Sequence, residues 1–124
     1  MHSLNTIIEQ NKSKARKLID LTLKNGGVNF NHGLNPLKID KGFTVSIENN
    51  LTTYNLLEVE KALNRLSKKR VCHVGCFFGL WIRDKLIYLD SNINLPNKEL
   101  ALEIANDRKE IAIYDNEKKE AVIL

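Results

Sequence analysis

Residues 79–115 constrain the fold most, because the predicted strands, turn and helix in this segment are joined by very short connections. An apolar and aromatic run ends in turn residues at 83–85, and residues 86–89 return as a partner strand. A helix over 98–107 and a strand over 111–114 complete the segment. A hairpin, a helix and a strand in this order predict a helix packed on an antiparallel sheet.

The other residues extend the same pattern in both directions. Periodicity and turn residues predict the following elements: a helix over 4–24, a short strand over 28–30, a strand over 43–47, a helix over 56–69, one or two strands over 71–82, and a last strand over 121–124. Asn49 and Asn50 are expected to start the turn after the strand over 43–47. The chain is therefore predicted to be an α+β protein, with a mostly antiparallel sheet and about three helices packed on one face.

The length of 124 residues and an apolar share of 43% predict one domain over residues 1–124. The helix at the start has a polar interruption over 10–14, so residues 1–14 are a candidate for a mobile helical arm. No apolar run approaches the roughly 20 residues that cross a bilayer, and the first residues do not resemble a secretion signal. We expect a cytoplasmic protein without a membrane partner.

Cys72, His73 and Cys76 are the most metal-like group in the sequence. Their spacing lacks a second ligand pair, and a strand would point His73 away from both cysteines. A cysteine nucleophile with a histidine base is the alternative, although no flanking signature supports it. Asp84 and Asp90 are expected at turns or strand ends, where aspartate bonds locally. The sequence thus predicts buried thiols, no metal, no cofactor and no catalytic residue.

The formal charge is +4, and basic residues are concentrated in two segments of the chain. The candidate residues for binding a partner or a nucleic acid are Lys12, Arg16, Lys68, Lys69, Arg70 and Trp81. The alternatives are a solvated basic surface, with cations favoured near a helix C-terminus, and a tryptophan that belongs to the core.

Several strand and turn segments resemble small proteins carried by phages, plasmids and other mobile elements. The segments that carry the resemblance are 25–30, 42–47, 79–82, 88–91 and 111–115, with Ala101, Ala105 and Asn106 between them. The chain has Lys109-Glu110 where that group has Asn-Gln. The resemblance implies a shared fold and a mobile-element setting, and it brings no catalytic residues.

A small protein of this setting without a catalytic signature is expected to act by binding. The first expectation is an inhibitor of a bacterial defence effector, similar to an anti-CRISPR protein, which blocks the effector or its nucleic acid by steric occlusion. The alternative is an accessory or regulatory protein that binds nucleic acid on its own, with a steep dependence on salt. An enzyme that uses Cys72, His73 or Cys76 is the third class.

Overall fold

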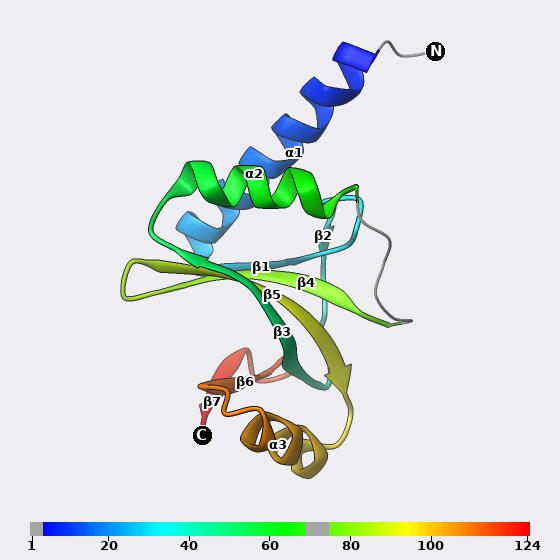
Figure 1. The fold of residues 1–124 in the computed structure, drawn as a ribbon. Helices are drawn as coiled ribbons and strands as arrows, with labels where there is room; N and C mark the ends of the chain where they lie inside the picture. The colour runs from blue at the N-terminus through cyan, green and yellow to red at the C-terminus, as the bar shows by residue number, and fades with distance from the viewer. Residues whose placement is uncertain (1–3, 69–74) are drawn as a thin grey trace.

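The computed structural model describes residues 4–68 and 75–124, and within them the chain forms three helices and one seven-stranded antiparallel sheet (Figure 1). The elements are α1 (Leu4–Asn25), β1 (Gly27–Phe30), β2 (Pro36–Leu37), β3 (Phe43–Thr53), α2 (Leu56–Leu66), β4 (Phe77–Arg83), β5 (Leu86–Leu95), α3 (Lys98–Asp107), β6 (Ala112–Asp115) and β7 (Glu120–Ile123). The predicted α+β class is confirmed.

The sheet has the order β2-β1-β4-β5-β3-β6-β7, so the centre of the sheet is formed by β4, β5 and β3. Asp84 and Lys85 connect β4 to β5 with φ angles of 52° and 68°. Two consecutive left-handed residues form the turn that matches the twist of a tight hairpin. The predicted hairpin around residues 83–85 is therefore confirmed.

The helices begin and end where local chemistry predicts. α1 ends at Asn25, and Gly26 follows with a φ of 90°, which costs glycine no steric strain. The side chain of Asn55 accepts hydrogen bonds from the backbone N–H groups of Leu57 and Glu58, and it thereby caps α2. Asn97 caps α3 through the N–H of Leu100.

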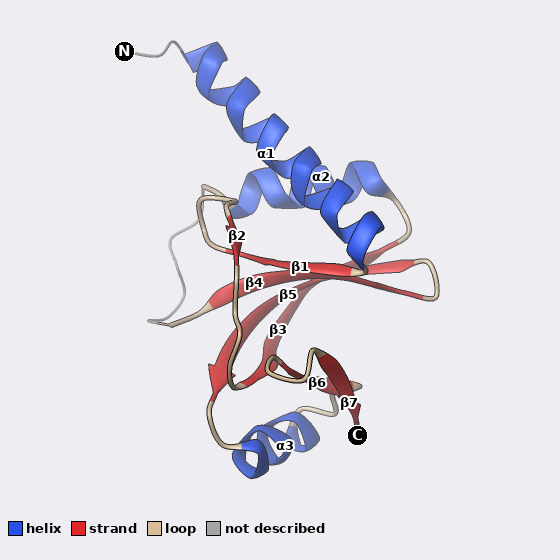
Figure 2. Cartoon of the chain, turned by 180° about the vertical axis from the view of Figure 1, so that it is seen from behind, coloured by secondary structure: helices blue, strands red, loops and turns tan. Residues whose placement is uncertain are grey.

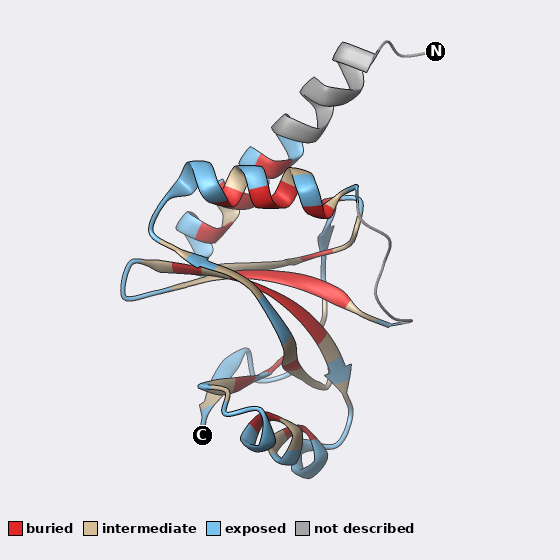
Figure 3. Cartoon of the chain, viewed as in Figure 1, coloured by how far each residue is buried: buried red, intermediate tan, exposed pale blue. Residues whose placement is uncertain are grey.

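Two apolar clusters hold the helices on the sheet (Figure 3). The first lies under α1 and α2 and includes Leu89 of β5, while the second lies under α3 and has Ile93 packed against it. Residues four apart in a strand point to the same face. All three helices therefore cover one face of the sheet, α1 and α2 at one end of β5 and α3 at the other.

The central strands are longer than the sequence patterns indicated. Asn49 and Asn50 do not start a turn, because β3 continues to Thr53. Register shifts between Ser46 and Glu48, and again between Asn49 and Leu51, place an extra residue in β3 at each point. These bulges bend the strand and turn the side chain of Asn49 toward the face that the helices leave open.

β5 likewise continues to Leu95. The expectation that Asp90 lies at a strand end is therefore wrong, because Asp90 lies in the middle of a central strand. There it pairs with Gly79 on β4 and with Asn49 on β3.

Candidate binding groove on the open face of the sheet

Polar side chains occupy the sheet face that the helices leave uncovered. Along β5, Leu89 and Ile93 face the helices, whereas the alternate residues Tyr88, Asp90 and Asn92 face the other side. The same alternation places Asn29 of β1 and the pair Gly79 and Trp81 of β4 on this side. The open face is thus built from aromatic rings, amides and one carboxylate.

This face is hollowed into a groove with a volume of about 950 Å³, which lies in the range of ligand sites. We call it the amide groove, and its defining side chains are Asn29, Asn49, Asn92, Asn116, Trp81, Tyr88 and Asp90. Residues 38–40 and the segment 109–114 also line it. Figure 2 shows the connection from β2 to β3 and the β6–β7 hairpin on the side of the sheet away from α1 and α2.

Asp90 organises the middle of the amide groove. Its Oδ2 accepts a hydrogen bond of 2.8 Å from Trp81 Nε1, and its Oδ1 accepts one of 2.8 Å from Asn49 Nδ2. The Oδ1 of Asn49 accepts a bond of 3.2 Å from the hydroxyl of Thr52. The rings of Trp81 and Tyr88 are stacked, with centroids 4.3 Å apart and an interplanar angle of 15°. The network fixes the indole in one orientation.

Two carboxyl groups of the groove have shifted pKa values. Burial raises the pKa of Asp90 above its ordinary value of 3.8, against the lowering effect of the hydrogen bonds from Trp81 and Asn49 and of the charge on Arg108. Burial also raises the pKa of Glu110, where the charge of Arg108 opposes the shift and that of Asp90 adds to it. Carboxyl groups with raised pKa values in one cleft are a feature that functional sites often share.

The raised pKa of Asp90 predicts a dependence of stability on pH. Between pH 3.8 and the raised pKa of Asp90, the folded protein binds more protons on this group than the unfolded chain does, so its contribution to the free energy of unfolding falls as the pH rises through that interval. The fall is about 1.4 kcal/mol for each unit by which the pKa is raised. Asp90→Asn removes the titration. We expect urea unfolding to show wild type losing stability relative to this variant as the pH rises from 3.8 through the raised pKa of Asp90, and parallel curves would contradict the shift.

Asn116 fixes the wall of the groove at its β6–β7 end. The residue is 2% exposed, and its Nδ2 donates to the carbonyl of Gly42 at 3.1 Å and to Thr44 Oγ1 at 2.9 Å. Its Oδ1 and the hydroxyl of Ser46 are buried without a hydrogen-bond partner among the described residues. This end of the groove therefore combines an amide nitrogen that is held by two hydrogen bonds with two unsatisfied polar atoms, an amide oxygen and a hydroxyl.

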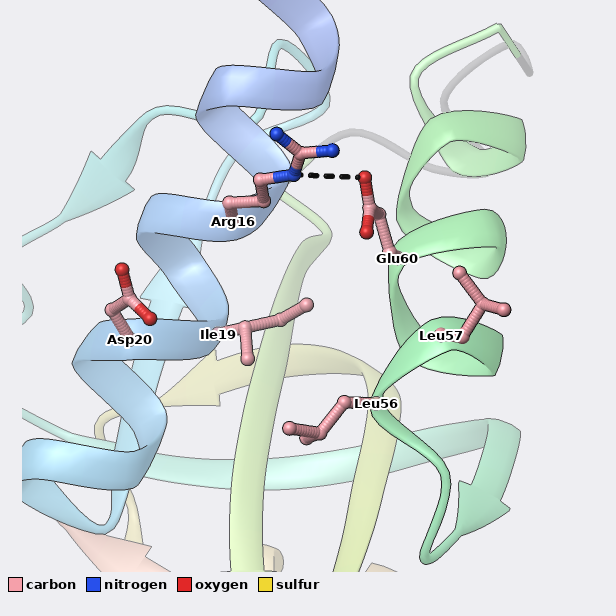
Figure 4. A pocket seen from close by; sticks show the side chains of 6 residues that line it. All are labelled: Arg16, Ile19, Asp20, Leu56, Leu57 and Glu60. Atoms are coloured by element: carbon pink, nitrogen blue, oxygen red, sulfur yellow. Dashed lines mark hydrogen bonds and ion pairs between the residues drawn. The ribbon is translucent and has the colours of Figure 1, made fainter.

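The structure does not bring the basic candidate residues together with Trp81. Arg16 lies on α1, where its Nε is 3.2 Å from Glu60 Oε1 on α2, beside Ile19 and Leu56 (Figure 4). Trp81 faces the opposite side of the sheet. Lys68 follows the end of α2 and is exposed. The side chain of Lys12 and the residues Lys69 and Arg70 lie outside the part that the structure describes.

Cys72 and His73 also lie outside the described residues. Cys76 is half-buried, and its Sγ lies 3.9 Å from the carbonyl oxygen of Phe77. In residues 4–68 and 75–124, no group of three or more His, Cys, Asp or Glu side chains is arranged to hold a metal ion. The described part of the chain also has no helix whose length and apolar character would let it cross a bilayer.

Comparison with known protein families, curated proteins and solved structures finds no match.

The sequence patterns single out Trp81 and Tyr88, but they place Asp90 at a strand end and give no binding role to Asn29, Asn49 or Asn92. The signal that could have found them is the alternation Tyr88, Asp90, Asn92 with apolar residues between them, which continues the strand past Leu89. Asn29 carried no comparable signal, because a four-residue strand offers too short a pattern.

Proposed function

We propose that this chain is a non-catalytic, cytoplasmic binding protein that inhibits a bacterial defence effector, such as a CRISPR nuclease. It binds a segment of the effector protein in the amide groove and thereby covers the effector surface around that segment. The observation that carries the proposal is the set of hydrogen-bonding side chains left uncommitted on the open sheet face. Asn29 and Asn92 line the groove, and neither forms a side-chain hydrogen bond with another described residue.

An amide that lines the groove without a bond inside the chain can donate to and accept from another molecule. The neighbouring amides Asn49 and Asn116 are both held by bonds within the chain. The groove therefore separates fixed amides, which maintain its shape, from open ones, which are available to a ligand. The stacked rings of Trp81 and Tyr88 add the kind of aromatic surface that is enriched at the centres of interfaces.

The charge of the groove favours a protein over a nucleic acid. Three lysines and three carboxylates line it, namely Lys38, Lys109, Lys119, Asp40, Asp90 and Glu110. A surface that tracks a phosphate backbone needs an excess of cations. On the helical side, Arg16 is paired with Glu60, and Lys14 lies 3.4 Å from the carbonyl of Gly33. Stand-alone nucleic-acid binding is thus the less supported alternative.

The test combines a DNA cleavage assay with a variant that alters only the groove. A Cβ atom at Gly79 would lie 2.6 Å from Asn92 Nδ2, so Gly79→Ala displaces an amide at the end of a side chain. We expect the wild-type protein to stop cleavage by at least one of a panel of purified CRISPR nucleases. Gly79→Ala is expected to weaken this inhibition at least about tenfold, which corresponds to about 1.4 kcal/mol of binding free energy.

Gly33→Ala is the matched control, because its Cβ would lie 3.1 Å from another asparagine amide, that of Asn35, in a loop that does not line the groove. It should inhibit as wild type does, and both variants should retain the wild-type circular dichroism spectrum. The proposal is wrong if no effector is inhibited or if both variants inhibit equally. Two results together would favour the nucleic-acid alternative. The wild-type protein would retard labelled DNA in a gel, and both this binding and the inhibition of cleavage would disappear as the salt concentration rises.

A further inference from the structure

Asp90 holds a buried carboxyl group in the middle of the amide groove without a cation paired to it. The residue is 6% exposed, and none of the ion pairs within residues 4–68 and 75–124 includes it. Arg108, whose charge acts on Asp90, is engaged elsewhere. Its Nε donates to the carbonyl oxygen of Ser46 at 2.9 Å and lies 3.4 Å from Glu110 Oε1. A desolvated carboxylate without an opposite charge costs free energy, and a cation brought by a partner would recover it.

The carboxylate of Asp90 can accept further hydrogen bonds. Trp81 on β4 donates to Oδ2 and Asn49 on β3 donates to Oδ1, so the two internal donors come from the strands on either side of β5. An ionised carboxylate offers about four acceptor positions, two on each oxygen. Each oxygen therefore keeps a position that the described residues do not use. Because Asp90 lines the groove, a ligand in the groove can reach the carboxylate.

A guanidinium group matches this site better than an ammonium group does. Arginine presents a planar pair of N–H donors that binds both oxygens of a carboxylate at once, whereas lysine is a point charge that holds its water more strongly. Tyr88 lies two residues from Asp90 on the same face of β5, and the indole of Trp81 bonds the carboxylate directly. The two rings offer apolar surface to the methylene groups of an arginine side chain.

We propose that Asp90, Trp81 and Tyr88 form a subsite for an arginine side chain of the protein partner. The guanidinium group donates one hydrogen bond to each oxygen of Asp90, and the methylene groups of the arginine pack against the two rings. This inference rests on the proposed function, because it names the chemistry of the effector segment that the groove binds.

The test follows the indole N–H signal of the ¹⁵N-labelled full chain, because Trp81 is the single tryptophan and bonds Asp90 directly. The probe is the peptide acetyl-Gly-Arg-Gly-amide, and matched peptides carry lysine or citrulline in place of arginine. Citrulline retains the planar shape of arginine and lacks its charge. At neutral pH we expect the arginine peptide to shift the signal in a saturable manner. The affinity should be at least about tenfold lower for the citrulline peptide, with the lysine peptide between the two.

Two variants separate a specific ion pair from a general attraction of charge. Asp90→Asn removes the charge that is proposed to bind arginine, whereas Asp20→Asn makes the same change at an exposed residue of α1. We expect Asp90→Asn to lower the affinity for the arginine peptide at least about tenfold and Asp20→Asn to leave it unchanged. Because a positive ligand favours the ionised carboxylate, saturation with the arginine peptide should also lower the pKa of Asp90 in the wild-type protein. A merely structural role of Asp90 would not produce this change.

Several results would overturn the subsite: equal affinities for the arginine and citrulline peptides, tighter binding of the lysine peptide, or no saturable response to arginine. The comparison of peptides uses the wild-type protein, so it decides the matter even if Asp90→Asn does not fold. The outcome is also separable from the cleavage assay. Inhibition that Gly79→Ala weakens, without a response to the arginine peptide, would leave the inhibitor proposal standing and reject the subsite. A response to arginine without inhibition of any effector would support the subsite and reject the inhibitor.

Discussion

Substitution of Phe30 by alanine is expected to lower the free energy of unfolding by about 3 to 5 kcal/mol. Phe30 is fully buried in the cluster under α1 and α2. The centroid of its ring lies 5.7 Å from the ring centroid of Phe78. Alanine would remove most of the buried side chain and leave a cavity between β1 and the helices. Because packed interiors relax only partly, the lost contacts are not replaced.

Urea unfolding followed by circular dichroism measures this loss. Tyr54→Ala is a suitable control, since Tyr54 is 71% exposed and its removal is expected to change stability by only about 0.5 kcal/mol or less. If the two variants lost similar amounts, the cluster would not be the main source of stability.

The sequence was sufficient to predict the elements whose signals are local. Asn55 and Gly26 mark helix ends through hydrogen bonds and backbone angles that depend on the nearest few residues. The alternation of Phe43, Val45 and Ile47 indicates a strand for the same reason. Such features require no knowledge of what lies across the sheet, so one sequence contains enough information for them.

The groove could not be predicted in the same way, because it depends on which strands are neighbours. Asn29 and Asn92 are 63 positions apart in the numbering (92 − 29), and only the order β1-β4-β5 places them on either side of Gly79. The bulges in β3 are a second reason why the groove cannot be predicted from the sequence. Without them the strict alternation of side chains would not turn Asn49 toward Asp90. Both facts arise from long-range pairing.

The sequence alone does not show which side of the sheet a basic or aromatic residue occupies. Arg16 and Trp81 are candidates for one surface because cations and aromatic rings together are typical of nucleic-acid surfaces. The structure separates them by a layer of sheet and gives Arg16 a carboxylate partner on α2. Whether Arg16 or Lys68 binds a partner stays a prediction, whereas the position of Trp81 in the groove gives that residue a specific environment.

Trp81→Ala is expected to have the largest effect on the groove itself. The change removes a hydrogen bond to the Asp90 carboxylate and a ring that stacks on Tyr88. Together these interactions contribute about 2 to 4 kcal/mol to the free energy of unfolding. Inhibition of a sensitive nuclease is expected to weaken at least about tenfold, since truncation of a central aromatic residue in an interface commonly costs 2 kcal/mol or more. Inhibition equal to that of wild type would place the binding surface outside the groove.

Trp81→Phe separates the ring from its hydrogen bond. Phenylalanine retains an aromatic face beside Tyr88 but has no N–H, so Asp90 Oδ2 loses its donor. The bond from Trp81 lowers the pKa of Asp90, and its removal leaves burial less opposed. The pKa of Asp90, measured by NMR titration of its carboxyl carbon, is therefore expected to rise further in this variant. An unchanged titration would mean that the indole does not stabilise the carboxylate, and that the network does not hold Trp81 in its orientation.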